Sequence, residues 1–210
     1  MRIESVRKGA SGTATIAAGG SFFLVNLDTL AALGLDSRSL EPGNELDETQ
    51  AALLALAAEA REAEKRALAL LARAEQSTFL LLCKLEQRGF SSQASSIAIE
   101  RLSASLLLDD RRFARAYAAS RLAHRGSRAE GPASLIRALR ERGIDRSIAI
   151  QVITEILGIE TEPEARERAL EAAAAKALKR SGGDREKARR FLREIGYKSE
   201  EIGAYFENTD

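Results

Sequence analysis

Cysteine, histidine and tryptophan are almost missing from this chain of 210 residues, which holds one cysteine, one histidine and no tryptophan. The single cysteine, Cys83, excludes an intramolecular disulfide and cannot by itself form a cysteine-based zinc site, so we expect a reduced, cytoplasmic setting. Nothing resembles a signal peptide, and no run approaches the roughly 18 apolar residues of a membrane helix. We therefore expect a soluble chain without membrane contact.

Common catalytic motifs are missing as well. The sequence has no GxxxxGK[ST] phosphate loop, no HExxH zinc motif and no GxSxG nucleophile turn. His124 falls at the border of an apolar helix face, and Cys83 lies inside an apolar run, so core packing explains both better than catalysis. Asp109 and Asp110 directly precede a helix, where a capping carboxylate is favourable. We expect no catalytic residue and no metal site.

What the chain does have is alanine, leucine and balanced charge. Hydrophobic residues make up 45% and aromatic residues only 5%, while 32 basic residues face 31 acidic ones. This composition is typical of helices with charged surfaces. Residues 1–60 hold 4 basic and 8 acidic residues, and residues 61–163 hold 17 and 13. The net charge of +1 is small for a protein whose main work is binding bare duplex DNA.

The first 46 residues are expected to hold strands and one short helix. A Gly-Gly pair suits a hairpin turn between strands. The expected strands are Met1–Val6, Thr13–Ala17 and Ser21–Val25. Asp28 is placed to cap a short helix, Thr29–Leu33. Asp47 with Gln50 then forms a plausible capping box that opens a long helix to about residue 73.

An internal repeat follows. The glycines of three similar segments are 54 and then 53 residues apart, and each segment has the form Leu, three mostly polar residues, Gly, apolar residue. The copies are Leu85 to Phe90, Leu139 to Ile144 and Leu192 to Tyr197. This pattern predicts a helix that ends at a left-handed glycine, after which the next apolar residue folds back onto the helix.

Each copy is expected to sit in a module of three helices. Apolar residues after each glycine share one helix face, although Ser95 stands at one of these positions, and Asp145 and Ser199 are placed as N-caps. We predict a mainly α fold of three tandem three-helix modules in an extended array, after a small β-containing N-terminal region. The predicted boundaries are 1–46, 47–108 for the long linking helix and first module, 109–160 for the second module and 161–210 for the third.

An arginine stripe is the candidate binding feature. Residues 111–128 contain six arginines and no acidic residue. Helical spacing places Arg111, Arg115, Arg121 and Arg125 on one side, with Phe113, Ala116, Tyr117 and Ser120 opposite. Two explanations stay open: a solvated face whose long side chains cover neighbouring surface, or a site that a phosphate or an acidic protein surface neutralises. The candidate binding residues are Arg111, Arg115, Arg121, Arg125, Arg128 and Arg137.

A second basic cluster lies in the third module. It consists of Arg185, Lys187, Arg189, Arg190 and Arg193. Glu186 and Glu194 lie among these residues, so a solvated face is the favoured interpretation.

The segment Leu107-Leu108-Asp109-Asp110-Arg111-Arg112-Phe113-Ala114 resembles the LDD-x-x-FA signature of the RecX regulatory family. Further matches are Gly131-Pro132 in the second module, Arg88-Gly89-Phe90-Ser91 in the first and Gly196-Tyr197 in the third. The resemblance spans roughly residues 60–208.

The resemblance implies a cytoplasmic protein without enzymatic activity or cofactor, acting in DNA repair, homologous recombination and the SOS response. It implies binding along the groove of the RecA–DNA filament, with inhibition of the recombinase and coprotease activities. Single- and double-stranded DNA would be contacted within the filament and only weakly alone, and we expect a monomer. Two alternatives stay open: a stand-alone helical DNA-binding module, and a helical scaffold for unrelated protein partners.

Overall fold

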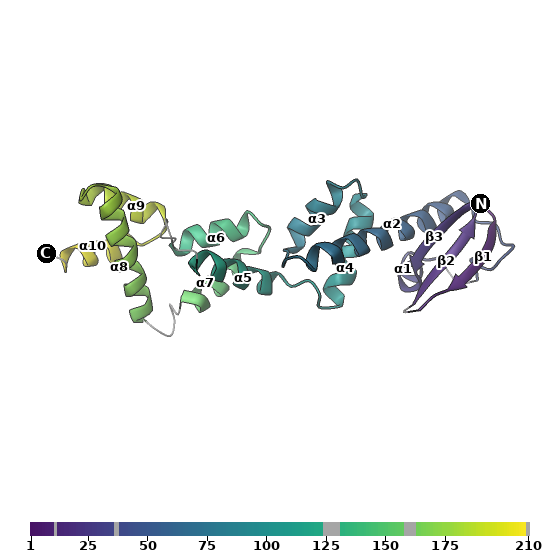
Figure 1. Ribbon diagram of the computed structural model, residues 1–210, viewed down its shortest axis with the longest axis horizontal. Coiled ribbons are helices and arrows are strands. Elements are labelled where there is room, and N and C mark those ends of the chain that lie inside the picture. Colours follow the sequence, from purple (N-terminus) through teal and green to yellow (C-terminus); the bar gives the residue numbers. More distant parts are fainter. Residues whose placement is uncertain (11, 36–37, 124–130, 158–162, 209–210) are drawn as a thin grey trace. The chain divides into compact units, whose positions relative to one another are not determined.

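The computed structural model describes residues 1–10, 12–35, 38–123, 131–157 and 163–208 (Figure 1). They divide into two compact units, Met1–Leu108 and Asp109–Asp210. Within the described residues, no helix is long and apolar enough to cross a membrane.

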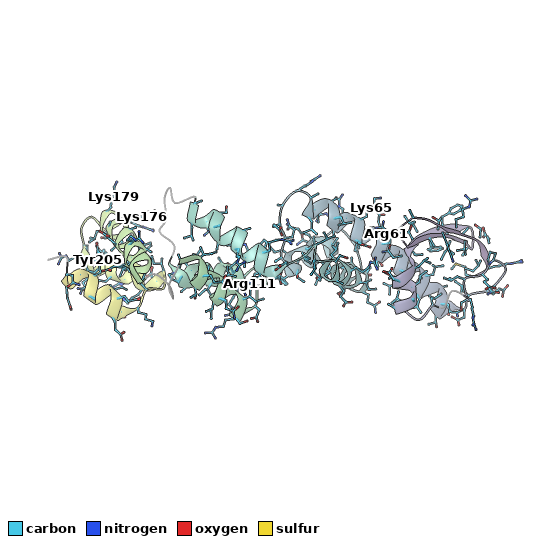
Figure 2. The ribbon with its side chains drawn as sticks, turned by 90° about the horizontal axis from the view of Figure 1, so that it is seen from below. Arg61, Lys65, Arg111, Lys176, Lys179 and Tyr205 are labelled. Carbon is cyan, nitrogen blue, oxygen red and sulfur yellow. The ribbon has the colours of Figure 1, made fainter. Side chains whose placement is uncertain are left out.

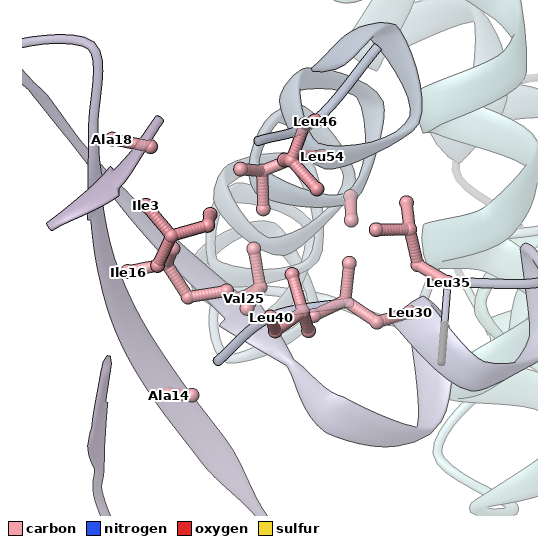
Figure 3. Close-up of a cluster of buried hydrophobic side chains, with 11 residues drawn as sticks. Ile3, Ala14, Ile16, Ala18, Val25, Leu30, Leu35, Leu40, Leu46 and Leu54 are labelled. Carbon is pink, nitrogen blue, oxygen red and sulfur yellow. The ribbon is translucent and has the colours of Figure 1, made fainter. Parts of the chain in front are cut away.

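A three-stranded antiparallel sheet opens the first unit, in the order β1-β2-β3. Its strands are β1 (Ile3–Lys8), β2 (Thr13–Ala18) and β3 (Ser21–Asn26). The predicted strands are therefore confirmed, and Gly19 and Gly20 turn the chain between β2 and β3 with φ of +55° and +74°. One face of the sheet is buried because alternate side chains point the same way. Figure 3 shows this core, in which Ile3, Ile16 and Val25 meet leucines of the following segments.

The short helix α1 (Leu27–Ala32) begins earlier than predicted. Asn26 occupies the capping position without a capping hydrogen bond, and Asp28 lies inside the helix. The prediction that Asp28 caps this helix is therefore wrong. Its carboxylate instead accepts a hydrogen bond from the Thr29 amide at 3.0 Å and pairs with Arg101.

The long helix α2 (Glu48–Leu71) opens with the predicted capping box. The Gln50 amide donates to the Asp47 carboxylate at 2.7 Å, and the Asp47 amide donates to the Gln50 side chain at 3.1 Å. The first half of α2 buries Leu54 and Ala57 against the sheet, and its second half buries Ala63 and Ala67 in the next core. One helix thus belongs to both cores of the first unit (Figure 1).

The first module adds α3 (Thr78–Glu86) and α4 (Ser92–Ala104) to α2. Leu81, Leu85 and Leu102 are fully buried between the three helices. Arg101 on α4 joins the module to the N-terminal region, since its guanidinium donates to Asp28 at 2.5 Å and to Glu64 on α2 at 3.2 Å.

The described residues of the second unit form six helices. They are α5 (Asp110–Ala123), α6 (Pro132–Arg140), α7 (Arg146–Leu157), α8 (Pro163–Arg180), α9 (Arg185–Glu194) and α10 (Ser199–Glu207). Asp145 caps α7 as predicted, because its carboxylate accepts from the Ser147 amide at 2.7 Å. The prediction for Ser199 is wrong: Lys198 occupies the capping position, and Glu201 accepts from the Lys198 amide at 3.0 Å.

All three glycine-ended helices close with the same hydrogen bonds. Gly89, Gly143 and Gly196 have φ of +88°, +78° and +100°, a conformation that costs glycine little because it has no Cβ. In each copy the amide after the glycine donates to the carbonyl of the repeat's leucine: Phe90 to Leu85 at 3.3 Å, Ile144 to Leu139 at 3.1 Å and Tyr197 to Leu192 at 3.1 Å. The predicted fold-back is confirmed in every copy.

The predicted fold class, mainly α with tandem three-helix modules after a small β-containing region, is confirmed. Leu85 and Leu192 lie in two separate cores, so these glycine-ended helices are not buried together. The extended array and the four domain boundaries stay predictions.

Candidate functional site

Helix α5 carries the described part of the arginine stripe, Arg111, Arg115 and Arg121, and Asp109 fixes where the helix begins. The Asp109 carboxylate accepts from the amides of Arg111 at 2.8 Å and Arg112 at 3.0 Å, which confirms a capping role for this residue. Among the described residues, no group of three or more His, Cys, Asp or Glu side chains is placed to hold a metal ion.

The residues that helical spacing places opposite the stripe are only partly buried. Phe113, Ala114 and Ala118 are buried, while Ala116 and Ser120 are exposed. Ala114 and Ala118 lie beside the arginine stripe on the helix surface, and α5 packs against α7. The stripe therefore flanks a helix–helix contact, so its long side chains can reach residues of α7.

Two residues of α5 face two residues of α7 across this contact. The two residues on each helix are one helical turn apart. Arg111 and Arg115 lie on α5, and Gln151 and Glu155 lie on α7. One guanidinium nitrogen of Arg111 donates to Gln151 at 2.9 Å and another pairs with Glu155 Oε1. Arg115 donates to Glu155 Oε2 at 2.6 Å. One carboxylate thus bridges two arginines with both of its oxygens, and Figure 2 labels Arg111 among the side chains of this unit.

This cluster is open to solvent, and in the part of the chain that the structure describes Arg111 and Arg115 share the carboxylate of Glu155. The side chains of Arg111, Arg115 and Glu155 are 39%, 55% and 42% exposed. The hydrogen bond from Arg115, together with the charge of Arg111, lowers the pKa of Glu155 below its usual value, so it is ionised at neutral pH. Two positive charges then face one negative charge.

Arg121, another member of the stripe, lies beside an aromatic ring. The guanidinium of Arg142, just after α6, lies 4.3 Å from the ring centre of Tyr117 on α5. Arg121 lies 5.8 Å from the same ring centre. Both distances suit cation–π attraction, so Arg121 belongs to a second cluster that ties α5 to the end of α6.

Of the remaining candidates, the structure describes only Arg137. Arg125, Arg128 and His124 lie outside the described residues. Arg137 is exposed in the last turn of α6. No carboxylate of the described residues joins it to Arg111 and Arg115 as Glu155 joins those two.

The basic cluster of the third module is compensated locally. Lys187 pairs with Asp184 at 3.1 Å, and Arg189 pairs with Glu186 at 3.2 Å. Arg180 lies over the ring of Phe191 at 5.1 Å. These short-range pairs are what the solvated-face interpretation predicts, so the α5–α7 cluster is the better candidate site.

Sequence reasoning missed Glu155 and Gln151. The predicted counter-charge for the stripe was a phosphate or an acidic protein surface, and for Arg111 and Arg115 part of it is a carboxylate of the same chain. The available signal was the spacing of α7: Gln151 and Glu155 are polar neighbours of the apolar positions Val152 and Ile153.

No protein-family model and no curated protein matches the chain. Solved structures do match it. A crystal structure of regulatory protein RecX is 22% identical and aligns with a TM-score of 0.70 over 96% of this chain and 97% of that one. A crystal structure of RecX from Lactobacillus salivarius is 19% identical, with a TM-score of 0.59 over 71% of this chain and 96% of the other. The chain therefore has a RecX-like fold.

Proposed function

We propose that the chain is a regulatory protein of the RecX family, which binds the RecA filament along its groove and inhibits the recombinase and coprotease activities of RecA. The observation that carries this proposal is the likeness in fold to regulatory protein RecX over nearly the whole of both chains. The LDD-x-x-FA segment supports it, because Asp109 and Phe113 of this segment cap and anchor α5.

Tandem modules suit a repetitive target. A chain of three modules can contact successive subunits of a polymer, and several weak contacts then add through effective concentration. The near-neutral charge suits a target that combines protein surface with phosphate. In this account the protein acts as a cytoplasmic monomer without catalytic activity, in DNA repair, homologous recombination and the SOS response.

The arginines of the second module are the proposed contacts to the filament. Arg111 and Arg115 are exposed on α5 and carry one positive charge more than Glu155 removes. The further members of the proposed surface are Arg121, Arg125, Arg128 and Arg137.

The test is DNA-dependent ATP hydrolysis by RecA, followed with and without substoichiometric amounts of this protein. We expect inhibition at ratios well below one chain per RecA subunit, because one chain bound in the groove affects several subunits. Unchanged hydrolysis would contradict the proposal. Tight, strongly salt-dependent binding to bare DNA together with unchanged hydrolysis would instead favour the stand-alone DNA-binding module.

Replacing Arg111, Arg115, Arg121 and Arg125 with Ala should weaken this inhibition by about tenfold, since four such charged contacts of roughly 0.4 kcal/mol each together come to about the 1.4 kcal/mol of a tenfold change. Circular dichroism checks that helicity is retained. The matched control replaces Lys179, Arg185, Arg190 and Arg193, which removes the same charge from the third module. Equal loss in both variants would mean that the filament responds to net charge and not to this surface.

A further inference from the structure

The contact between α5 and α7 has the form of an occupied anion site. Both oxygens of the Glu155 carboxylate are engaged, one by each guanidinium, and Gln151 steadies Arg111 from the same helix as Glu155. A phosphodiester likewise presents two non-bridging oxygens that share one negative charge. The two arginines can therefore donate to a phosphate in the same way as they donate to this carboxylate.

The carboxylate can be displaced. All three side chains are between 39% and 55% exposed, and ion pairs with this much solvent access are weak. Glu155 can turn outward into solvent without leaving a buried charge behind. Arg111 and Arg115 would then retain two positive charges at one point of the surface.

A nucleic acid fits the vacated site better than an acidic protein surface does. A carboxylate of another protein would only exchange one carboxylate for another, so little free energy of binding would be gained. A nucleic acid strand brings neighbouring phosphates along an arginine-rich helix face and releases its condensed counterions, a gain that a single carboxylate lacks. Along α5, the residues from Arg111 to Arg121 include four arginines for such a strand and no acidic residue to repel it.

We propose that Glu155 is an internal competitor of nucleic acid: its carboxylate occupies the Arg111–Arg115 site until a phosphodiester displaces it. This inference rests on the proposed function for its biological setting. It names nucleic acid as the ligand of the Arg111–Arg115 site and Glu155 as the group that restrains binding there. The competition keeps binding to bare DNA weak, while a filament that already holds the chain in place supplies the phosphate at high local concentration.

Glu155→Gln tests the inference, because glutamine keeps the shape of the side chain and removes its charge. Binding of fluorescein-labelled oligothymidylate and of a labelled duplex is followed by anisotropy between 50 and 200 mM salt, taken as an experimental range in which phosphate contacts are resolved. We expect Glu155→Gln to bind single strands about threefold more tightly or better at the low-salt end. The slope of log affinity against log salt should steepen by about 0.7 for single strands and about 0.9 for duplex per phosphate gained.

Two controls make the result specific. Glu141→Gln removes one negative charge from an exposed position of the same module, after α6, and should leave affinity and slope nearly unchanged. Adding Arg111→Ala and Arg115→Ala to Glu155→Gln should abolish the gain. An unchanged affinity in Glu155→Gln, an equal gain in Glu141→Gln, or a gain that survives loss of both arginines would each overturn the proposal.

This outcome is separate from that of the proposed function. RecA is absent from the anisotropy experiment, so the Glu155 restraint can stand even where RecA hydrolysis is unaffected. Inhibition of RecA by the wild-type chain, combined with no gain in Glu155→Gln, would keep the proposed function and remove only this inference.

Discussion

Ser95 is the residue at which the first module departs from the repeat. The equivalent positions hold Ala149 in the second module and Ile202 in the third, and all three side chains are buried. The Ser95 hydroxyl is buried without a hydrogen-bond partner among the described residues. A buried polar group without a partner destabilises the folded state.

Ser95→Ala should therefore raise the free energy of unfolding by about 1 kcal/mol, because it removes an unpaired hydroxyl and fills the position as the second module does. Urea unfolding followed by circular dichroism measures the change. Ser92→Ala, an exposed change on the same helix, is the control and should have little effect. A clear loss of stability in Ser95→Ala would mean that the hydroxyl is satisfied in solution.

Asp28 should make stability depend on pH. Burial alone would raise the pKa of this carboxyl, but the hydrogen bond and charge of Arg101 outweigh it and hold the pKa below the ordinary value of 3.8. Because the folded-state pKa is depressed, the stabilisation is complete above pH 3.8 and is lost as the pH falls through the folded-state pKa.

The comparison of wild type with Asp28→Asn measures this contribution. Wild type should be the more stable at pH 7, and the difference should shrink as the pH falls below about 4. Urea unfolding at a series of pH values gives the curve. A difference that stays constant from pH 7 to pH 3 would contradict the ion pair with Arg101.

At the scale of elements, helix ends that carry a strong local signal were predictable. The capping box at Asp47, the cap at Asp145 and the glycine ends depend on residues within one turn of each other, so the sequence contains the whole interaction. Asp28 was misassigned because its main partner, Arg101, is 73 residues away. Glu155 was missed for the same reason, since it pairs with arginines 40 and 44 residues away.

One contact between elements of the second unit depends on two glycines. A Cβ at Gly131, which precedes α6, would lie 2.1 Å from the backbone carbonyl oxygen of Ile195 at the end of α9. A Cβ at Gly196 would lie 2.1 Å from the Cβ of Ala133 on α6. The beginning of α6 and the end of α9 therefore lie so close together that a side chain at Gly131 or Gly196 would not fit.

Gly131→Ala should lower the free energy of unfolding by about 2 kcal/mol, because a backbone atom must move to make room. Gly203→Ala is the matched control: it lies within α10 with nothing within 4 Å, so alanine should stabilise the helix by about 0.5–1 kcal/mol. Thermal unfolding compares the two. Equal stability of Gly131→Ala and wild type would show that this approach is not maintained in solution.

At the scale of the whole molecule, most of the fold prediction depended on the internal repeat. Its even spacing gave the number of modules, and Leu85 and Leu192 lie in separate cores. The small N-terminal sheet followed from alternating short strands and a Gly-Gly turn. Sequence alone could not show that α2 is shared between the sheet and the first module, because that depends on packing along one helix.

The separate cores also matter for function. The first and third modules bury their own leucines, so under the proposed function each can present its own surface to a polymer. Arg101, through Asp28 and Glu64, ties the N-terminal region to the first module. We expect that region to stay with the first module when the protein binds.

Cryo-electron microscopy of RecA–DNA filaments mixed with this protein tests the central claim most directly. The account predicts density that follows the filament groove, spans more than one RecA subunit and places α5 of the second module toward the DNA. Filaments without such density, or with density confined to the outer surface away from the groove, would contradict it.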